Sequence, residues 1–117
     1  MLPYCELRLH MLSTAEGGRT TPIYPNGAQK EGFYMPHVRT SPDGEYLGVA
    51  LLRGPHELWP GMDGEVVVAC IYHPNVDYSS LTPGAAVEVL EGRTIIARGV
   101  VLRRWEGGDD WRSGMPT

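Results

Sequence analysis

The chain is poor in lysine, phenylalanine and cysteine, and it lacks any long apolar run. Of its 117 residues only Lys30 is a lysine and only Phe33 is a phenylalanine, whereas 15 are glycine and 10 are proline. This density of turn-forming residues disfavours long helices and favours an all-β fold with many turns. No apolar run approaches the roughly 18 residues that cross a bilayer, so we expect no membrane-spanning segment.

Basic side chains are also scarce. The chain has 10 lysine and arginine residues against 14 acidic ones, which gives a formal net charge of -4. Broad electrostatic attachment to nucleic acid is therefore not encoded, because it needs clustered basic side chains. The opening stretch MLPYCELRLH carries Glu6 and Arg8 and lacks a continuous apolar core, unlike a signal peptide. We therefore expect a soluble, cytoplasmic protein.

The residues that commonly bind metals do not form a recognisable ligand pattern. Cys5 and Cys70 lie in separate apolar, strand-like runs, so we expect buried, reduced thiols rather than a disulfide. The 4 histidines also lack the spacing of a zinc site. No strand-like run leads into a glycine-rich loop that ends in Lys-Ser or Lys-Thr, which excludes a GTPase phosphate loop. We predict neither a metal site nor a nucleotide or other cofactor.

Alternating apolar and polar residues predict the first β-strand, and runs rich in valine and isoleucine predict the strands from residue 45 onward. In the first such stretch Leu7, Leu9 and Met11 fall on one face, and Arg8 and His10 fall on the other. The predicted strands are residues 5–12, 32–40, 45–54, 64–73, 85–92 and 93–105.

These strands are closely spaced, and the last two are joined so briefly at residues 90–94 that they should form an antiparallel hairpin. We predict a small, all-β, six-stranded antiparallel closed barrel, since closure removes exposed edge strands. A two-sheet sandwich is the alternative. We expect one domain over residues 1–105 and a flexible C-terminal tail over residues 106–117, except where Trp111 docks.

Several motifs occur in an order that resembles a known family. They are LRLHMLSTAEGGRTTPIY, GFYM, WPGMD, CIYHPNV and LEGRTIIARGVV, and together they span about residues 5–104. The chain resembles the third, C-terminal β-barrel domain of elongation factor Tu, here as a free-standing domain. The resemblance implies a six-stranded antiparallel barrel.

The resemblance also implies positions that face RNA. In the family this domain contacts the T-stem backbone of transfer RNA, and the matching positions here are Arg19, Thr20, Glu91 and Gly92. The residues themselves allow another interpretation, in which the glycine pair at 17–18 shapes a turn and Arg19 pairs with a nearby carboxylate. The last hairpin is also one glycine shorter than the Glu-Gly-Gly-Arg of the family.

Aromatic residues suggest a protein interface instead. The loop HELWPGMDG places Trp59 near His56 and Met62, and Tyr78 lies in a later turn. Tyrosine and tryptophan anchor interfaces because they combine a large contact area with a polar group. We take these four residues as protein-interface candidates, although some aromatic side chains must fill the core.

Three functions follow, of which a non-catalytic module that binds a protein partner through loops and aromatic surface is preferred. A binder of the transfer RNA stem is the alternative, and the acidic net charge favours the first over it. A small hydrolase is a distant third. Ser79 and Ser80 lie close to Asp77, but a serine nucleophile also needs a positioned base and an oxyanion hole. Turn formation explains this stretch more simply.

Overall fold

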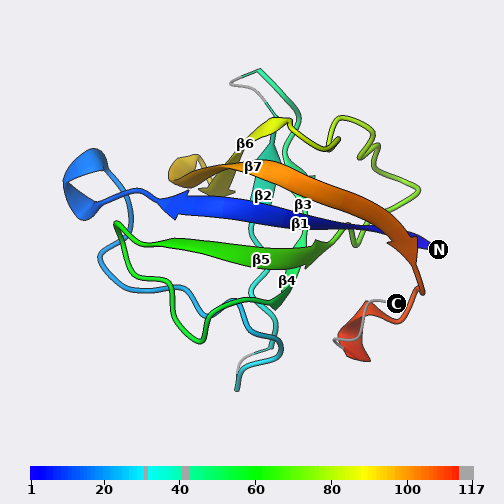
Figure 1. Ribbon diagram of the computed structural model, residues 1–117, viewed down its shortest axis with the longest axis horizontal. Helices are drawn as coiled ribbons and strands as arrows, with labels where there is room; N and C mark the ends of the chain where they lie inside the picture. Colours follow the sequence, from blue (N-terminus) through cyan, green and yellow to red (C-terminus); the bar gives the residue numbers. More distant parts are fainter. Residues whose placement is uncertain (31, 41–42, 114–117) are drawn as a thin grey trace.

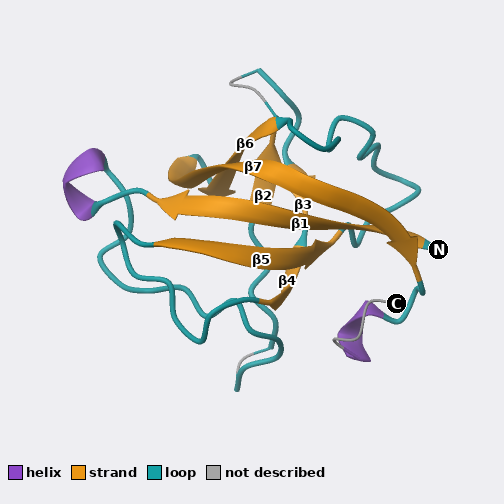
Figure 2. Ribbon diagram, viewed as in Figure 1, coloured by secondary structure: helices purple, strands orange, loops and turns teal. Residues whose placement is uncertain are grey.

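The computed structural model describes residues 1–30, 32–40 and 43–113 and is built from antiparallel strands (Figure 2). The strands are β1 (Leu2–Met11), β2 (His37–Arg39), β3 (Leu47–Gly48), β4 (Ala50–Arg53), β5 (Asp63–Ala69), β6 (Ala86–Glu91) and β7 (Thr94–Gly107). Two short 3-10 helices, η1 (Thr14–Glu16) and η2 (Trp111–Ser113), complete the secondary structure. The predicted all-β class is confirmed. Over the described ranges, no helix is long and apolar enough to cross a membrane.

All strands belong to one curled sheet with the order β3-β2-β6-β7-β1-β5-β4 (Figure 1). The first and last long strands pair at its centre, from Leu2 opposite Gly107 to Met11 opposite Ala97. β3 pairs with β2, and β4 pairs with β5. β3 and β4 are thus the two edge strands of the sheet. They are also neighbours in the chain, separated by Val49 alone. The result is an antiparallel half-barrel.

The observed strands differ from the predicted ones mainly around the middle of the chain. The predicted strand 32–40 shrinks to His37–Arg39, since Pro36 has no N–H to donate and only the residues after it form a regular ladder. The predicted strand 45–54 is interrupted at Val49. In contrast, β1 starts earlier and β7 ends later than predicted, because each is extended by pairing with the other.

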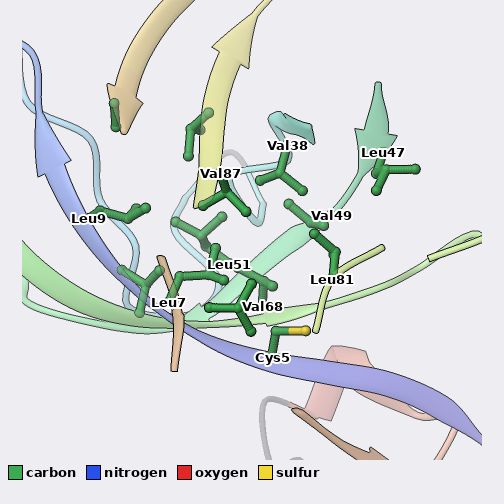
Figure 3. Packing of buried hydrophobic residues seen from close by; sticks show 14 of the residues in the cluster. Cys5, Leu7, Leu9, Val38, Leu47, Val49, Leu51, Val68, Leu81 and Val87 are labelled. Carbon is green, nitrogen blue, oxygen red and sulfur yellow. The ribbon is translucent and has the colours of Figure 1, made fainter. Parts of the chain in front are cut away.

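The main core fills the inside of the curl. Leu7, Leu9 and Met11 are at most 1% exposed, whereas Arg8 and His10 point outward, as the alternation predicts. Figure 3 shows Leu7 together with core side chains from neighbouring strands, directed into one interior space. The buried cysteines Cys5 and Cys70 are both free thiols, in agreement with the sequence.

A second, smaller apolar cluster lies on the other side of the sheet. It combines Leu2, Tyr4, Ala50, Leu52, Ala69 and Trp111. Trp111 is 7% exposed and meets Phe33 edge to face, with 5.2 Å between ring centroids. The expected docking of Trp111 is thus confirmed, because apolar side chains on this side of the sheet need a cover, and β7 continues through Gly107. Residues 114–117 lie outside the described part.

Candidate functional site

The loop after β1 is shaped by a capping box and a glycine pair. The Ser13 hydroxyl accepts from the Glu16 N–H at 3.2 Å, and the Glu16 carboxylate accepts from the Ser13 N–H at 2.9 Å. Gly17 ends η1 with φ +94°. Gly18 is needed for a different reason, since a Cβ there would lie 2.4 Å from the Leu12 carbonyl oxygen. The pair therefore forms a turn, as predicted, with one positive φ and one close approach.

Arg19 turns its guanidinium back onto its own loop and onto the last hairpin. Its Nε donates to the Thr21 carbonyl at 3.1 Å, and one terminal nitrogen donates to the Thr21 hydroxyl at 3.0 Å and the Pro22 carbonyl at 3.1 Å. The other terminal nitrogen forms an ion pair with the Glu91 carboxylate. The interpretation of Arg19 as the partner of a nearby carboxylate is confirmed.

Tyr34 completes this cluster from the segment that precedes β2. Its hydroxyl donates to the Glu91 carboxylate at 2.5 Å. Burial, together with the neighbouring Glu91 carboxylate, raises the pKa of Tyr34 above its ordinary value, so the hydroxyl remains a donor. Arg19, Tyr34 and Glu91 thus tie together three segments that are far apart in the sequence. We call these three residues the Glu91 cluster.

The positions implied to face RNA therefore do converge. Arg19 and Glu91 are in contact, and both are partly buried. Thr20 and Gly92 follow them in the chain and are exposed, as is Arg93 in the hairpin turn. The hairpin thus offers exposed polar groups, whereas most donors of Arg19 are already engaged inside the protein.

A short bridge between two distant loops orients the aromatic residues. Ile23 and Leu58 exchange backbone hydrogen bonds of 3.0 Å and 2.9 Å, and both side chains are buried. Because side chains alternate along extended backbone, their neighbours Tyr24 and Trp59 point outward. They are 41% and 45% exposed. His56 lies edge to face with Tyr24, with 6.2 Å between ring centroids.

The turn that carries Trp59 is fixed to the end of β1. The Met62 N–H donates to the Trp59 carbonyl at 3.0 Å, and the Met11 N–H donates to the Met62 carbonyl at 2.8 Å. The Gly61 N–H donates in return to the Met11 carbonyl at 2.9 Å. Met62 is 43% exposed. We call Tyr24, His56, Trp59 and Met62 the aromatic face; it contains three of the four interface candidates.

The fourth candidate, Tyr78, is a core residue, which corrects its assignment to the surface. Its side chain is 1% exposed. Its hydroxyl donates to the Gly48 carbonyl at 2.5 Å and accepts from the Tyr72 N–H at 3.2 Å. Burial raises the pKa of Tyr78 to about 12. Tyr78 thus fastens the loop after β5 to β3, and its ring is not available to a partner.

Two open pockets adjoin the aromatic face. The first, of about 330 Å³, lies between the Glu91 cluster and Tyr24 and is lined by Arg19, Pro22, Ile23, Tyr24, Gln29, Gly32, Phe33 and Tyr34. The second, of about 350 Å³, is lined by Tyr24, Gln29, Lys30 and His56. They share Tyr24 and Gln29, and we call them together the Tyr24 groove. The sequence did not indicate this groove, because the bridge that builds it joins residues 35 positions apart.

The Asp77 stretch has the geometry of a turn. The Asp77 carboxylate accepts from the Ser79 N–H at 2.9 Å, and this hydrogen bond holds the pKa of Asp77 below its ordinary value. The carboxylate is thus engaged with the backbone, as in an Asx turn. Within the described ranges, no group of three or more His, Cys, Asp and Glu side chains is arranged to hold a metal ion.

Comparison with known proteins adds no identification. No protein-family model matches the chain. A search of curated proteins also finds no match. The function is therefore argued from the geometry above.

Proposed function

We propose that this chain is a non-catalytic module that binds a protein partner through the aromatic face. The observation that carries the proposal is the exposure of Tyr24, Trp59 and Met62 on backbone that is itself held by hydrogen bonds. Large aromatic side chains presented in a fixed arrangement lose little conformational entropy on binding, and tryptophan and tyrosine are enriched among binding hot spots.

The proposal extends to the fold, which we describe as a closed six-stranded barrel similar to the third domain of elongation factor Tu. Two further hydrogen bonds support closure across the interruption at Val49. The Val49 N–H donates to the Pro36 carbonyl at 3.2 Å, and the Leu51 N–H donates to the Tyr34 carbonyl at 3.0 Å. If β3 and β4 are counted as one interrupted strand, the seven strands become six. Protection of the Val49 and Leu51 amides from hydrogen exchange tests this closure.

Partner capture tests the binding function. The immobilised protein and its Trp59→Ala variant are incubated with extract of the source cells, crosslinked, and compared by quantitative mass spectrometry. A hot-spot contribution of about 2 kcal/mol predicts a loss of about 30-fold in affinity for the true partner in Trp59→Ala. Tyr46→Ala is the matched control, because Tyr46 is similarly exposed, at 41%, but lies against His37 and Arg39 instead. Equal recovery of every protein with Trp59→Ala and with the unchanged chain contradicts the proposal.

RNA binding at the last hairpin is the second candidate function. It is favoured by the convergence of Arg19 and Glu91, next to the exposed Thr20 and Gly92. The test is titration with transfer RNA at about 50 mM and about 200 mM salt, where phosphate contacts predict steeply weaker binding at the higher salt. Arg93→Glu is the informative variant, since Arg93 is exposed, whereas Arg19→Ala also breaks the Glu91 cluster. If the affinity for transfer RNA changes neither with salt nor in Arg93→Glu, RNA binding at the last hairpin is eliminated.

A further inference from the structure

The chain contains one asparagine that is followed by glycine. Of its 2 asparagines, Asn26 precedes Gly27 and Asn75 precedes Val76. The main-chain nitrogen of the residue after an asparagine can attack the side-chain carbonyl carbon of that asparagine, because the bond between them closes a five-membered ring. Glycine favours this attack, since it has no Cβ to obstruct the nitrogen. The composition of Asn26–Gly27 therefore suits conversion of the asparagine to an acid.

Asn26 lies in the loop between η1 and β2, and its side chain is free to rotate. The residue is exposed. Its main-chain carbonyl accepts from the Gln29 side chain at 3.2 Å, whereas its own side-chain amide has no hydrogen-bond partner among the described residues. The side chain can therefore turn toward Gly27 without giving up a hydrogen bond to them.

Gly27 has the open surroundings that the attack requires. Apart from its chain neighbours, the nearest atom that a Cβ at Gly27 would meet is the Leu52 carbonyl oxygen, at 3.6 Å. The Gly27 N–H donates to the Pro25 carbonyl at 3.2 Å. This hydrogen bond spans only two residues, so it is bent, and its length is at the upper end of the normal range. Such a bond in an exposed loop opens at little cost, which makes the Gly27 nitrogen available.

The loop is attached to the rest of the molecule on both sides of this dipeptide. Before it, Ile23 and Leu58 exchange the backbone hydrogen bonds described above. After it, Gln29 and Gly32 exchange hydrogen bonds of 3.0 Å and 2.9 Å. A covalent change at Asn26 falls between these attachments, so it should alter the loop and leave the fold intact.

Asn75 offers a comparison within the same chain, because it is also exposed. The residue after it, Val76, is branched at Cβ and packs against the main core. The Val76 N–H donates to the Tyr72 carbonyl at 3.0 Å. The nitrogen that follows Asn75 is therefore both crowded and engaged, so exposure alone should not make Asn75 reactive.

We propose that Asn26 is a modification site, at which the folded protein deamidates through a cyclic imide formed with Gly27. The Gly27 nitrogen loses its proton and bonds to the Asn26 Cγ, the bond from Cγ to Nδ2 breaks, and Nδ2 leaves as ammonia. Water then opens the ring and is the only co-reactant. This inference goes beyond the binding function and does not depend on it.

The ring can open at either of its two carbonyl carbons. If the bond from the Gly27 nitrogen to Cγ breaks, Asn26 becomes an aspartate on an unchanged main chain. If the bond to the main-chain carbonyl carbon breaks, the chain continues through the former side chain as isoaspartate, which inserts one extra carbon into the loop. The carbonyl to which Gln29 donates then becomes part of a free carboxylate. Either product adds one negative charge to a chain with net charge -4.

The test is incubation of the folded protein at neutral and at mildly alkaline pH, followed by trypsin digestion and mass spectrometry. Cleavage after Arg19 and Lys30 releases residues 20–30, which contain Asn26. We expect this peptide to gain the mass of amide-to-acid conversion, faster at the higher pH because the attacking nitrogen must lose a proton. Conversion should be at least about 10-fold faster at Asn26 than at Asn75, where the branched Val76 crowds the nitrogen. A sample digested without incubation gives the background, and equal conversion of the two asparagines overturns the proposal.

The identity of the product tests the cyclic imide. Isoaspartate forms only by opening of the ring, whereas direct hydrolysis of the side-chain amide gives aspartate alone. Electron-based fragmentation of the peptide distinguishes the two, and we expect isoaspartate among the products. Aspartate without isoaspartate contradicts the proposed reaction.

Two matched variants locate the reaction by ion-exchange chromatography, which separates the more acidic product. Asn26→Ser should abolish the acidic form that accumulates during incubation, and Asn75→Ser should leave it unchanged. Accumulation of the same form in Asn26→Ser overturns the assignment.

A synthetic peptide of residues 20–30 separates the reactivity of the dipeptide from the effect of the fold. Circular dichroism confirms that the protein stays folded during incubation. Conversion at comparable rates in the peptide and in the folded protein supports the proposal. If the peptide deamidates and the folded protein does not, the hydrogen bond from Gly27 to Pro25 protects the site and the proposal is wrong.

Discussion

Arg19 contributes to the structure of this protein mainly by joining loops that the chain order separates. Its ion pair with Glu91 spans 72 residues, and each side chain is about one quarter to one third exposed, at 25% and 33%. Both groups are therefore partly desolvated, and the same carboxylate accepts from Tyr34. Removal of one partner would leave the other with unmet hydrogen bonds, which costs more than the loss of an exposed pair.

We therefore predict that Glu91→Ala lowers the free energy of unfolding by about 2 kcal/mol. Arg19→Ala should have a similar effect, and the double variant should be clearly less destabilised than the sum of the two single variants. Urea unfolding followed by tryptophan fluorescence measures all three. Arg8→Ala is the control, since Arg8 is 60% exposed where it pairs with Glu65. Strict additivity of Arg19→Ala and Glu91→Ala would show that the two side chains act independently.

The contacts of single side chains were harder to predict from the sequence than the strands. The sequence allowed Arg19 to pair with a carboxylate, but it could not select Glu91, because that contact depends on the curl of the sheet. Tyr78 was assigned to the surface because tyrosine suits both interfaces and cores. Only the position of its loop against Gly48 determines that it is buried.

At the scale of elements, η1 owes its shape to reciprocal hydrogen bonds between Ser13 and Glu16. Donation from the Ser13 N–H and from its hydroxyl lowers the pKa of Glu16 below its ordinary value of 4.5. A carboxyl whose pKa is lower in the folded state stabilises that state while it is ionised. This stabilisation is fully present above pH 4.5 and is lost as the pH falls through the folded-state pKa.

We predict that Glu16→Ala lowers the melting temperature at neutral pH, and that the difference from the unchanged chain shrinks below about pH 4.5. Thermal unfolding measured by circular dichroism between neutral pH and about pH 3 provides the comparison. Glu57→Ala serves as the control carboxyl. A difference that stays constant across this range would show that the charge of Glu16 has no role in the cap.

Strands were predictable where one physical pattern dominates. The alternation in β1 places apolar residues on one face, and β6 and β7 are rich in valine and isoleucine; these three strands lie where the sequence predicted them. The strand around Pro36 was predicted too long, because the residues before it make only isolated hydrogen bonds, from Leu51 to Tyr34 and from Val49 to Pro36, and no regular ladder. The Ile23–Leu58 bridge was not predicted, since its two residues lie in loops and carry no periodic signal.

At the scale of the whole molecule, the chain has apolar clusters on both sides of its sheet. The outer cluster is closed by Trp111, which lies beyond the domain boundary predicted at residue 105. The tail has further contacts with the start of β1: the Tyr4 hydroxyl donates to the Gly108 carbonyl, and the N-terminal amine lies 2.8 Å from Asp109. These contacts indicate that the tail contributes to stability.

We predict that Trp111→Ala lowers the free energy of unfolding by about 2 to 3 kcal/mol, somewhat less than a tryptophan in the main core. The reason is exposure of Phe33, Leu52 and Ala69 in the outer cluster. Urea unfolding measures the loss, and increased binding of a hydrophobic dye reports the exposed surface. Trp59→Ala, at a tryptophan that is 45% exposed, is the control. If a chain truncated after residue 105 is as stable as the full chain, the tail does not contribute to stability and the domain ends at residue 105.

The central pairing of β1 with β7 also determines when the protein can fold. β1 precedes β7 in the chain, with the other described strands between them, yet the two lie side by side over almost their whole length. During translation the edge of β1 that pairs with β7 has no partner until β7 has left the ribosome. Contacts of such large sequence separation form slowly and leave apolar surface exposed in the meantime. Until β7 arrives, the unpaired edge of β1 is therefore open to pairing with other chains.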